Sequence, residues 1–175
     1  MITLKEIREY AEEGYRTVPV IKSYSTDEIT TITALKKMKA AYDHVFMLES
    51  ALSDHKTGRY TFLGVDPVLE VTATNGKVRV AEKGQEIGES RQTVEETLRG
   101  ILARYRSPHV EGAPHFTGGL VGYFTYEFYQ YLEKEIDFSA ENSEDLPDVD
   151  LMLFDKIICF DHYTHQTLII SHMSL

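Results

Sequence analysis

The chain has 175 residues, and its 28 acidic and 18 basic side chains give a formal net charge of -10. A field of this sign repels nucleic acid and anionic lipid, so neither is expected as a partner. Hydrophobic residues make up 42% of the chain, which suffices for a packed core, but no apolar run approaches the ~20 residues of a membrane-spanning helix. The first residues lack the layout of a signal peptide, and the single cysteine, Cys159, excludes an internal disulfide. The sequence therefore predicts a soluble, cytoplasmic protein.

Two helices and a short strand are predicted in the first forty residues. A capping box is a Thr or Ser that is followed three residues later by Glu. This spacing predicts the start of one helix at Thr3 and of another at Ser25. The first helix ends at Gly14, and the second ends in a lysine-rich turn near residue 39. Between them, residues 18–21 are β-branched and contain a proline, which confines a strand to a sheet edge or to its own first residues.

The middle of the chain predicts an antiparallel meander. Short β-type runs cover residues 45–51, 60–64 and 68–74. The dipeptide Asn75-Gly76 that follows is a strong signal for a two-residue hairpin turn, because Asn and Gly tolerate the positive φ that such a turn requires.

The last part of the chain predicts helices and strands in runs. Residues 92–106 carry an apolar stripe at helical spacing, and the glycine-rich residues 116–124 predict a strand that leads into another helix. Residues 139–150 form an acidic, solvated connector, and residues 151–160 and 167–171 predict two buried strands joined by a turn. Without regular β-α-β alternation, this order favours an α+β fold with antiparallel sheets and packed helices.

The glycines Gly118, Gly119 and Gly122 allow two interpretations. Bare backbone amides at a helix start bind phosphate, but this spacing matches neither GxGxxG nor GxxxxGK[ST]. Glycines inside a strand more often mark a bulge or the close approach of a neighbouring backbone. We favour the second, structural interpretation.

Three histidines, His162, His165 and His172, raise the question of a metal site. Residues 162 and 165 would face opposite ways in a regular strand, and the usual ligand spacings are absent. Cys159 lies in an apolar run, where a thiol behaves as a small core group rather than as a nucleophile. We therefore predict no metal ligands and no catalytic residue in this chain.

The segment 46–51 is the most informative candidate for a binding site. This apolar strand ends with Glu49 and Ser50, and a polar loop leads from it to Arg59 and Tyr60. Glu49, Ser50 and free carbonyls suit an ammonium group, while Arg59 or backbone amides suit a carboxylate, as in a zwitterionic amino acid. Glu49 and Ser50 share a pocket only if the strand bulges or ends there. The alternative is a strand that ends in a serine cap and a surface ion pair.

Four ordered blocks of the sequence resemble the N-terminal region of anthranilate synthase component I. The blocks are Leu48-Glu49-Ser50-Ala51, residues 58–64 (GRYTFLG), residues 116–124 (FTGGLVGYF), and residues 145–148 (DLPD) with residues 160–162 (FDH). Aminodeoxychorismate synthase component I, a related chorismate-using enzyme, has this region in looser form. The Leu-Glu-Ser-Ala block favours the anthranilate family.

The resemblance implies that residues 1–175 are the regulatory and scaffolding N-terminal domain of that enzyme. In the family this element helps to bind tryptophan, the feedback inhibitor. By motif, Ser50 would contact the ligand, with Glu49 and Ala51 as its neighbours. Arg59 and Tyr60, in the next block, complete the implied set.

The resemblance also implies what lies elsewhere. The family converts chorismate and glutamine or ammonia into anthranilate and pyruvate, with Mg2+ and a glutamine amidotransferase subunit. Its catalytic and metal-binding residues belong to a C-terminal domain that is absent from this chain, so we expect the chain alone to be inactive and without a cofactor. Aminodeoxychorismate synthase of folate biosynthesis and a non-catalytic module that docks the amidotransferase remain alternatives. We also expect exposed tyrosine and phenylalanine side chains that would pack against the missing half, or a homo-oligomer that covers them.

Overall fold

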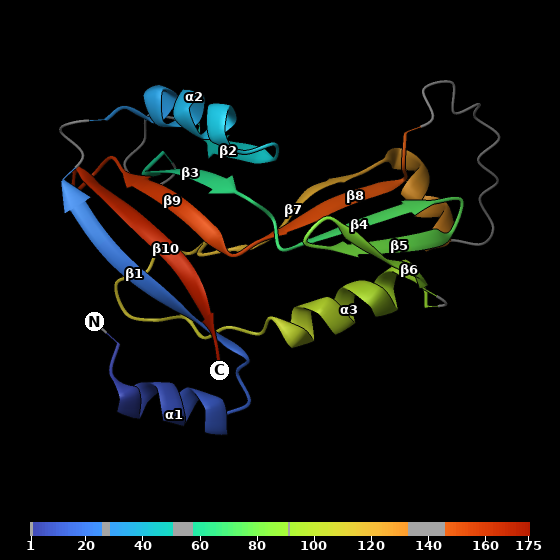
Figure 1. Ribbon diagram of the computed structural model, residues 1–175, viewed down its shortest axis with the longest axis horizontal. Helices are drawn as coiled ribbons and strands as arrows, with labels where there is room; N and C mark the ends of the chain where they lie inside the picture. Colours follow the sequence, from blue (N-terminus) through green and yellow to red (C-terminus); the bar gives the residue numbers. More distant parts are fainter. Residues whose placement is uncertain (1, 26–28, 51–57, 91, 133–145) are drawn as a thin grey trace. The chain divides into compact units, whose positions relative to one another are not determined.

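The computed structural model describes residues 2–25, 29–50, 58–90, 92–132 and 146–175, and the chain divides into two compact units (Figure 1). Unit 1 comprises residues 1–67, 104–119 and 154–175, and unit 2 comprises residues 68–103 and 120–153. Each unit is built around its own five-stranded sheet with accompanying helices. The predicted α+β class with antiparallel sheets is confirmed.

The sheet of unit 1 combines strands from both ends of the chain. Its strands, in order across the sheet, are β1 (Thr17–Ser25), β10 (Gln166–Ser174), β9 (Lys156–Asp161), β3 (Tyr60–Val65) and β2 (Val45–Glu49). Every neighbouring pair is antiparallel. The strand predicted over residues 18–21 is β1, and its proline lies in an edge strand, as the missing N–H of proline requires.

The helix α2 (Thr31–Ala41) packs on one face of this sheet. Its buried Ala34 forms a core cluster with Leu63 of β3 and Phe160 of β9. The helix begins at Thr30, whose hydroxyl accepts a hydrogen bond from the backbone N–H of Thr33. The predicted start at Ser25 is therefore wrong, because Ser25 is the last residue of β1 and pairs with β10 instead.

The opposite face of the sheet carries an aromatic cluster. Phe46 of β2 contacts Phe116 and Phe154, with ring centroids 6.3 and 4.7 Å apart, and Phe62 of β3 contacts Phe116 at 5.4 Å. The ring of Phe46 lies over Gly64, at the place that any larger side chain would need for its Cβ. These contacts tie the segment before β7 to the core of unit 1.

The strands of the unit 2 sheet, in order across it, are β6 (Gln85–Ser90), β5 (Lys77–Glu82), β4 (Leu69–Thr74), β8 (Val149–Phe154) and β7 (Gly119–Phe124). The predicted meander over residues 45–80 is wrong as one unit, because β2 and β3 pair in the sheet of unit 1 and only β4 and β5 of its strands belong to the sheet of unit 2. Asn75 and Gly76 have φ values of 50° and 76° and join β4 to β5, which confirms the predicted hairpin. The predicted helix over residues 92–106 is α3 (Val94–Arg104), and a capping box of Thr93 and Glu96 opens it.

The glycine run has a structural role, as the sequence suggested. A Cβ on Gly122 would collide with the carbonyl oxygen of Asp150 in the adjacent β8, and a Cβ on Gly118 would lie 2.7 Å from the carbonyl oxygen of Phe154. Both residues also have φ values near +156°, which L-residues rarely adopt. Glycine is required here because two backbones approach closely.

The end of the chain differs from the prediction in two respects. Residues 151–160 are not one strand, because Asp155 separates β8 from β9 and the two strands belong to different sheets. The predicted helix after the glycine run is a short 3-10 helix, η1 (Tyr126–Tyr131). Its Tyr131 hydroxyl donates to Asp148 and accepts from the Gly76 N–H at 2.8 Å.

Asp148 was expected in a solvated connector but is buried. Besides the Tyr131 hydroxyl, its carboxylate accepts the Asn75 backbone N–H at 2.9 Å, so it joins the β4–β5 turn to the start of β8. Burial and the hydrogen bond to Asp148 raise the pKa of Tyr131 to about 12. Residues 139–145 of the predicted connector lie outside the described part of the chain.

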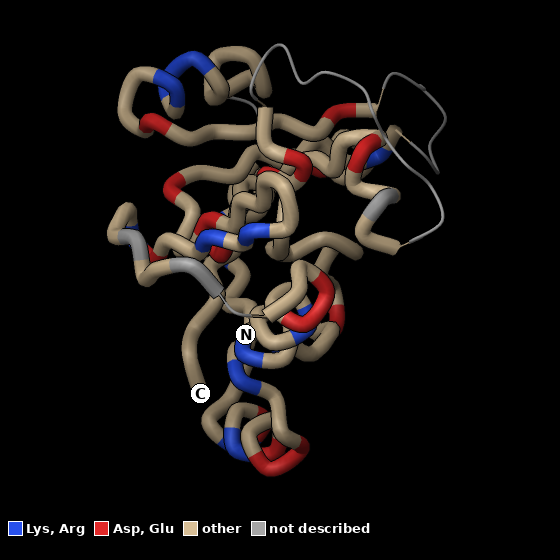
Figure 2. The backbone as a smooth tube through the Cα atoms, turned by 90° about the vertical axis from the view of Figure 1, so that its right-hand side faces the viewer, with Lys and Arg blue, Asp and Glu red and all other residues tan. Residues whose placement is uncertain are grey.

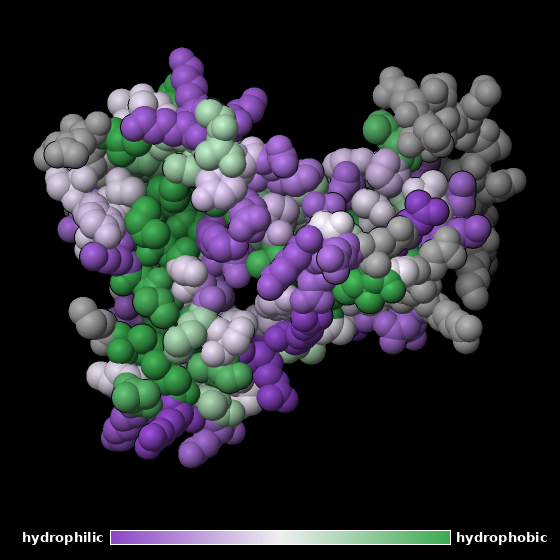
Figure 3. Space-filling view, in the orientation of Figure 1, coloured by the Kyte–Doolittle hydropathy of each residue, from purple (hydrophilic) through white to green (hydrophobic). Residues whose placement is uncertain are grey.

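Exposed aromatic side chains are present, as expected. The most exposed are Tyr126, Tyr163, Tyr24, Phe124 and Tyr129. In unit 1, Figure 3 shows hydrophobic side chains gathered between α1 (Leu4–Glu12) and α2. Figure 2 shows acidic and basic residues interspersed along the backbone. Among the described helices, none combines the length and the apolar character needed to cross a membrane.

Candidate functional site

The residues predicted to bind an amino acid lie at one edge of the unit 1 sheet. The strand β2 ends at Glu49, β3 begins at Tyr60, and β9 ends at Asp161. Because the three strands are antiparallel, these ends meet: Glu49 lies opposite Thr61, and Tyr60 lies opposite Asp161. Ser50 directly follows β2, so the strand ends between Glu49 and Ser50. A strand end at this point is one of the two conditions under which these residues can share a pocket. We call this group of strand ends the β2 edge. Ala51, which was also predicted as a site residue, lies outside the described residues.

A hydrogen-bonded chain links Glu49 to a histidine that the prediction did not include. The Thr61 hydroxyl donates to Glu49 Oε1 at 3.4 Å and lies 2.8 Å from Nε2 of His162. A hydroxyl has one hydrogen, so when it is given to Glu49, the histidine Nε2–H must be the donor to Thr61. Thr61 is fully buried, whereas Glu49 is exposed. The arrangement fixes one oxygen of Glu49 and leaves the carboxylate at the surface.

Arg59 is held by an aspartate. Its Nε and Nη2 atoms donate to Asp161 Oδ1 and Oδ2 at 3.0 and 2.6 Å, the bidentate geometry in which guanidinium and carboxylate bind most strongly. Burial raises the pKa of Asp161, but hydrogen bonds from Arg59 and Thr164 outweigh it and lower the pKa to about 2. The guanidinium therefore already has a carboxylate partner, and backbone amides remain the alternative group for a ligand carboxylate.

Aromatic rings surround this ion pair. The guanidinium carbon of Arg59 lies 4.8 Å from the ring centroid of Tyr60 and 5.5 Å from that of Tyr163. The Tyr60 ring in turn contacts Phe62 at 5.7 Å. Burial raises the pKa of the Tyr60 hydroxyl, so this group stays neutral. The β2 edge thus offers a carboxylate, a hydroxyl and flat apolar surface within one small region.

Three residues of this edge were not predicted as site residues: Thr61, Asp161 and His162. Asp161 and His162 are separated from their partners by 102 and 101 positions in the sequence. The signal that pointed to them was the Phe160-Asp161-His162 block of the family resemblance. This block singled out Asp161 and His162 in the sequence, but it did not indicate which residues they would contact.

Of the other candidate residues, His172 has structural partners. His172 lies 3.1 Å from the Thr117 carbonyl oxygen and 3.4 Å from the Thr17 hydroxyl, and burial lowers its pKa. Cys159 is fully buried, and burial raises its pKa to about 12, which is unsuited to a nucleophile. Within the described ranges, no group of three or more His, Cys, Asp or Glu side chains is placed to hold a metal ion.

Comparison with known proteins identifies the family. The sequence profile of the chorismate binding enzyme family matches residues 45–174, from the first residue of β2 to the end of β10. Anthranilate synthase component 1 of Acetivibrio thermocellus is 28% identical over 98% of this chain and 34% of its own length. The protein of the same name from Pseudomonas aeruginosa is 32% identical over 90% of this chain and 32% of its own length. The chain thus spans about a third of the length of these relatives.

A solved structure supports the fold. The crystal structure of anthranilate synthase component I from Streptococcus pneumoniae TIGR4 superimposes with a TM-score of 0.52 at 23% identity, over 85% of this chain and 31% of that chain. At this identity the likeness concerns the fold alone. The profile match covers well over half of the sequence and includes the β2 edge. The chain belongs to the chorismate binding enzyme family and is similar to anthranilate synthase component I.

Proposed function

We propose that the chain is the N-terminal regulatory and scaffolding part of an anthranilate synthase component I and supplies part of a site for tryptophan as feedback inhibitor. The observation that carries this proposal is the meeting of Glu49, Ser50 and Tyr60 at the β2 edge. The family match over residues 45–174 supports it. The relatives from Acetivibrio thermocellus and Pseudomonas aeruginosa, which are both named anthranilate synthase component 1, support it as well.

The chemistry of the β2 edge suits the amino end of an amino acid. Glu49 is an exposed carboxylate with one oxygen held by Thr61, and Ser50 adds a hydroxyl beside it. Together they can accept hydrogen bonds from an ammonium group. The ring of Tyr60 provides a flat surface of the kind on which an indole packs. Arg59 contributes by holding Asp161 and the rings in place.

In the proposed enzyme, catalysis lies outside this chain. Conversion of chorismate and glutamine or ammonia into anthranilate and pyruvate would use residues and Mg2+ of a further domain, with a glutamine amidotransferase subunit as partner. Tryptophan and chorismate would occupy distinct sites whose affinities are coupled, which makes the inhibition allosteric. The compartment proposed for this reaction is the cytoplasm.

The test measures tryptophan inhibition of the gene product that contains this chain. Anthranilate formation from chorismate and ammonia is followed at rising L-tryptophan concentrations for the unchanged protein and for Ser50→Ala. Loss of a hydrogen bond to a charged ammonium costs about 1.5 to 3 kcal/mol, so inhibition should weaken by about tenfold to a hundredfold. The matched control is Ser23→Ala, an exposed serine on β1 at the opposite edge of the same sheet.

The outcomes separate the alternatives. Unchanged tryptophan sensitivity of folded Ser50→Ala would remove the inhibitor from the β2 edge. Formation of aminodeoxychorismate instead of anthranilate would assign the chain to the folate enzyme. Absence of both activities, combined with co-elution of the chain and an amidotransferase subunit in gel filtration, would favour a docking module.

A further inference from the structure

A cavity of unit 1 lies against β1, the edge strand on the other side of the sheet from β2. It has a volume of about 460 Å³, and nine residues line it. These are Ile2, Glu6, Tyr10, Pro19, Val20, Ile21, Val110, Glu111 and Gly112. The size falls within the range of small-molecule sites. We call it the α1 pocket.

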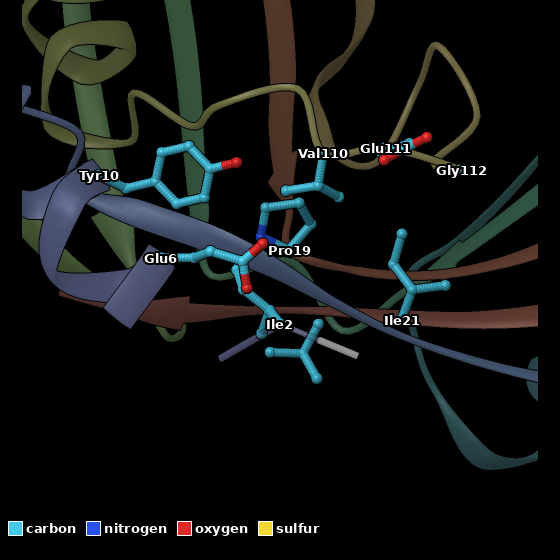
Figure 4. Close-up of a pocket in the computed structure, with 9 residues that line it drawn as sticks. Ile2, Glu6, Tyr10, Pro19, Ile21, Val110, Glu111 and Gly112 are labelled. Atoms are coloured by element: carbon cyan, nitrogen blue, oxygen red, sulfur yellow. The ribbon is translucent and has the colours of Figure 1, made fainter. Parts of the chain in front are cut away.

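The α1 pocket has an apolar floor and two walls. The floor is the edge strand β1, where the side chain of Pro19 is fully buried. One wall is the face of α1 that carries Glu6 and Tyr10, four residues apart and therefore on the same side of the helix. Figure 4 shows both side chains pointing from α1 toward Pro19, with Val110 on the far side of the proline.

The second wall is a fixed turn. The Ala113 N–H donates to the Val110 carbonyl oxygen at 3.1 Å, and Gly112 supplies the positive φ of +78° that this turn contains. The turn places Glu111 at the pocket. The segment leading to it is anchored to β1, because the Arg106 carbonyl oxygen accepts the N–H groups of Arg16 and Thr17 at 2.8 and 3.2 Å.

The helix wall is held by aromatic contacts. Tyr10 meets the ring of Tyr15 edge-on, with centroids 5.8 Å apart, and the guanidinium of Arg106 lies 4.6 Å from the centroid of the Tyr15 ring. The Arg106 guanidinium is thus engaged by an aromatic ring. Of the nine lining residues none is basic, while two are acidic and come from opposite walls.

Glu6 is both oriented and ionised. Its Oε2 accepts hydrogen bonds from the backbone N–H and the hydroxyl of Thr3, each at 2.7 Å. These bonds lower the pKa of Glu6, so it remains a carboxylate at neutral pH. The capping box therefore fixes a negative charge at a pocket that apolar residues such as Pro19, Ile21 and Val110 also line.

We propose that the α1 pocket binds a small organic amine, a primary ammonium on an apolar body that lacks a carboxylate. The apolar floor of Pro19, Ile21 and Val110 suits the body, and Glu6 and Glu111 suit the ammonium. A hydrated metal ion does not match such a floor. An amino acid is disfavoured because its carboxylate would face two carboxylates without a basic partner in the lining. The ligand class therefore differs from that proposed for the β2 edge.

The test follows methyl NMR signals of the whole chain during titration with three molecules that share one body. The probes are 2-phenylethylamine, which is cationic, 2-phenylethanol, which is neutral, and phenylalanine, which adds a carboxylate. The amine should shift the methyl signals of Ile2, Ile21 and Val110 saturably. It should bind more tightly than the alcohol or the amino acid, and added salt should weaken it.

Variants decide whether the two carboxylates are responsible. Glu111→Gln and Glu6→Gln should each weaken amine binding by about two- to fivefold, the effect of one solvent-exposed ion pair. Gln at position 6 preserves the capping box, so α1 stays intact. The double variant should bind amine and alcohol equally. The control Glu12→Gln changes an exposed carboxylate of α1 outside the pocket lining and should leave binding unchanged.

Three results would overturn the proposal. The first is the absence of saturable shifts at the pocket methyls with the amine. The second is equal binding of amine and alcohol by the unchanged chain. The third is amine binding that the double variant retains in full. None of these results bears on the β2 edge, so the two proposals fail separately.

Discussion

The ion pair between Arg59 and Asp161 is the residue-scale feature with the clearest consequence for stability. Asp161 has a side chain only 6% exposed and a pKa lowered from 3.8 to about 2. Because the folded pKa lies below the unfolded value, the pair stabilises the fold above about pH 4, and this contribution disappears as the pH falls towards 2. The expected size is about 2 kcal/mol.

Chemical denaturation between pH 6 and pH 2 tests this expectation. The unchanged chain should lose stability across this interval more steeply than Asp161→Asn, which should also be less stable at neutral pH because Arg59 loses its carboxylate partner. Glu95→Gln, which alters an exposed ion pair on α3, is the control and should keep the original pH dependence. Parallel pH profiles for the unchanged chain and Asp161→Asn would contradict the assignment.

At the same scale, the sequence predicted part of the candidate site. The strand end at Glu49 and Ser50 followed from an apolar run that turns polar, which is local information. The partners Asp161 and His162 did not follow, because pairing β3 with β9 across about a hundred residues is a tertiary event. The structure adds a carboxylate partner for Arg59 from β9, while its contact with a ligand stays a prediction.

The glycines of the β7–β8 contact allow a sharp prediction at the scale of elements. Gly122→Ala would place a Cβ against the Asp150 carbonyl oxygen at a φ of +157°, so either the two strands separate or the backbone is strained. We expect a loss of at least about 2 kcal/mol in the free energy of unfolding. The measurement is urea denaturation of the purified chain, with circular dichroism as the signal.

The chain provides a matched control with the opposite expected sign. Gly100 lies within α3, and a Cβ there would meet nothing within 4 Å. Gly100→Ala should stabilise the chain by about 0.5 to 1 kcal/mol, because alanine has the higher helix propensity. If Gly122→Ala proved as harmless as Gly100→Ala, the close approach of β7 and β8 would be refuted.

Most elements were predictable because their signals are local, and the errors occurred where tertiary pairing decides. The capping box at Thr3 and the Asn75-Gly76 turn were predicted correctly from adjacent residues. The capping pattern at Ser25 was misleading, because β10 recruits that residue into a strand. The apolar run 151–160 gave no sign that its two halves join different sheets. Periodicity reports that a residue is buried but not which sheet buries it.

At the scale of the whole molecule, the chain spans about a third of the length of its relatives. Within this chain, the β2 edge is exposed to solvent. Glu49 and Ser50 are exposed, and an exposed ion pair contributes only about 0 to 1 kcal/mol. Because Glu49 and Ser50, the groups proposed to bind the ligand, are exposed, we expect this chain alone to bind tryptophan with a dissociation constant of about 1 mM or weaker.

The composition of the chain makes this expectation easy to check. It contains no tryptophan residue, so the fluorescence of added L-tryptophan can be followed without background from the protein's own indole groups. With excitation where tyrosine does not absorb, the emission maximum and anisotropy should remain those of free tryptophan as the chain is added. A shift to shorter wavelength that saturates at micromolar protein, and that Ser50→Ala abolishes, would show instead that the β2 edge is a complete tryptophan site. The water-exposed position of Glu49 and Ser50 is the physical reason to expect the first result, since a ligand held only by exposed groups keeps most of its contacts with solvent.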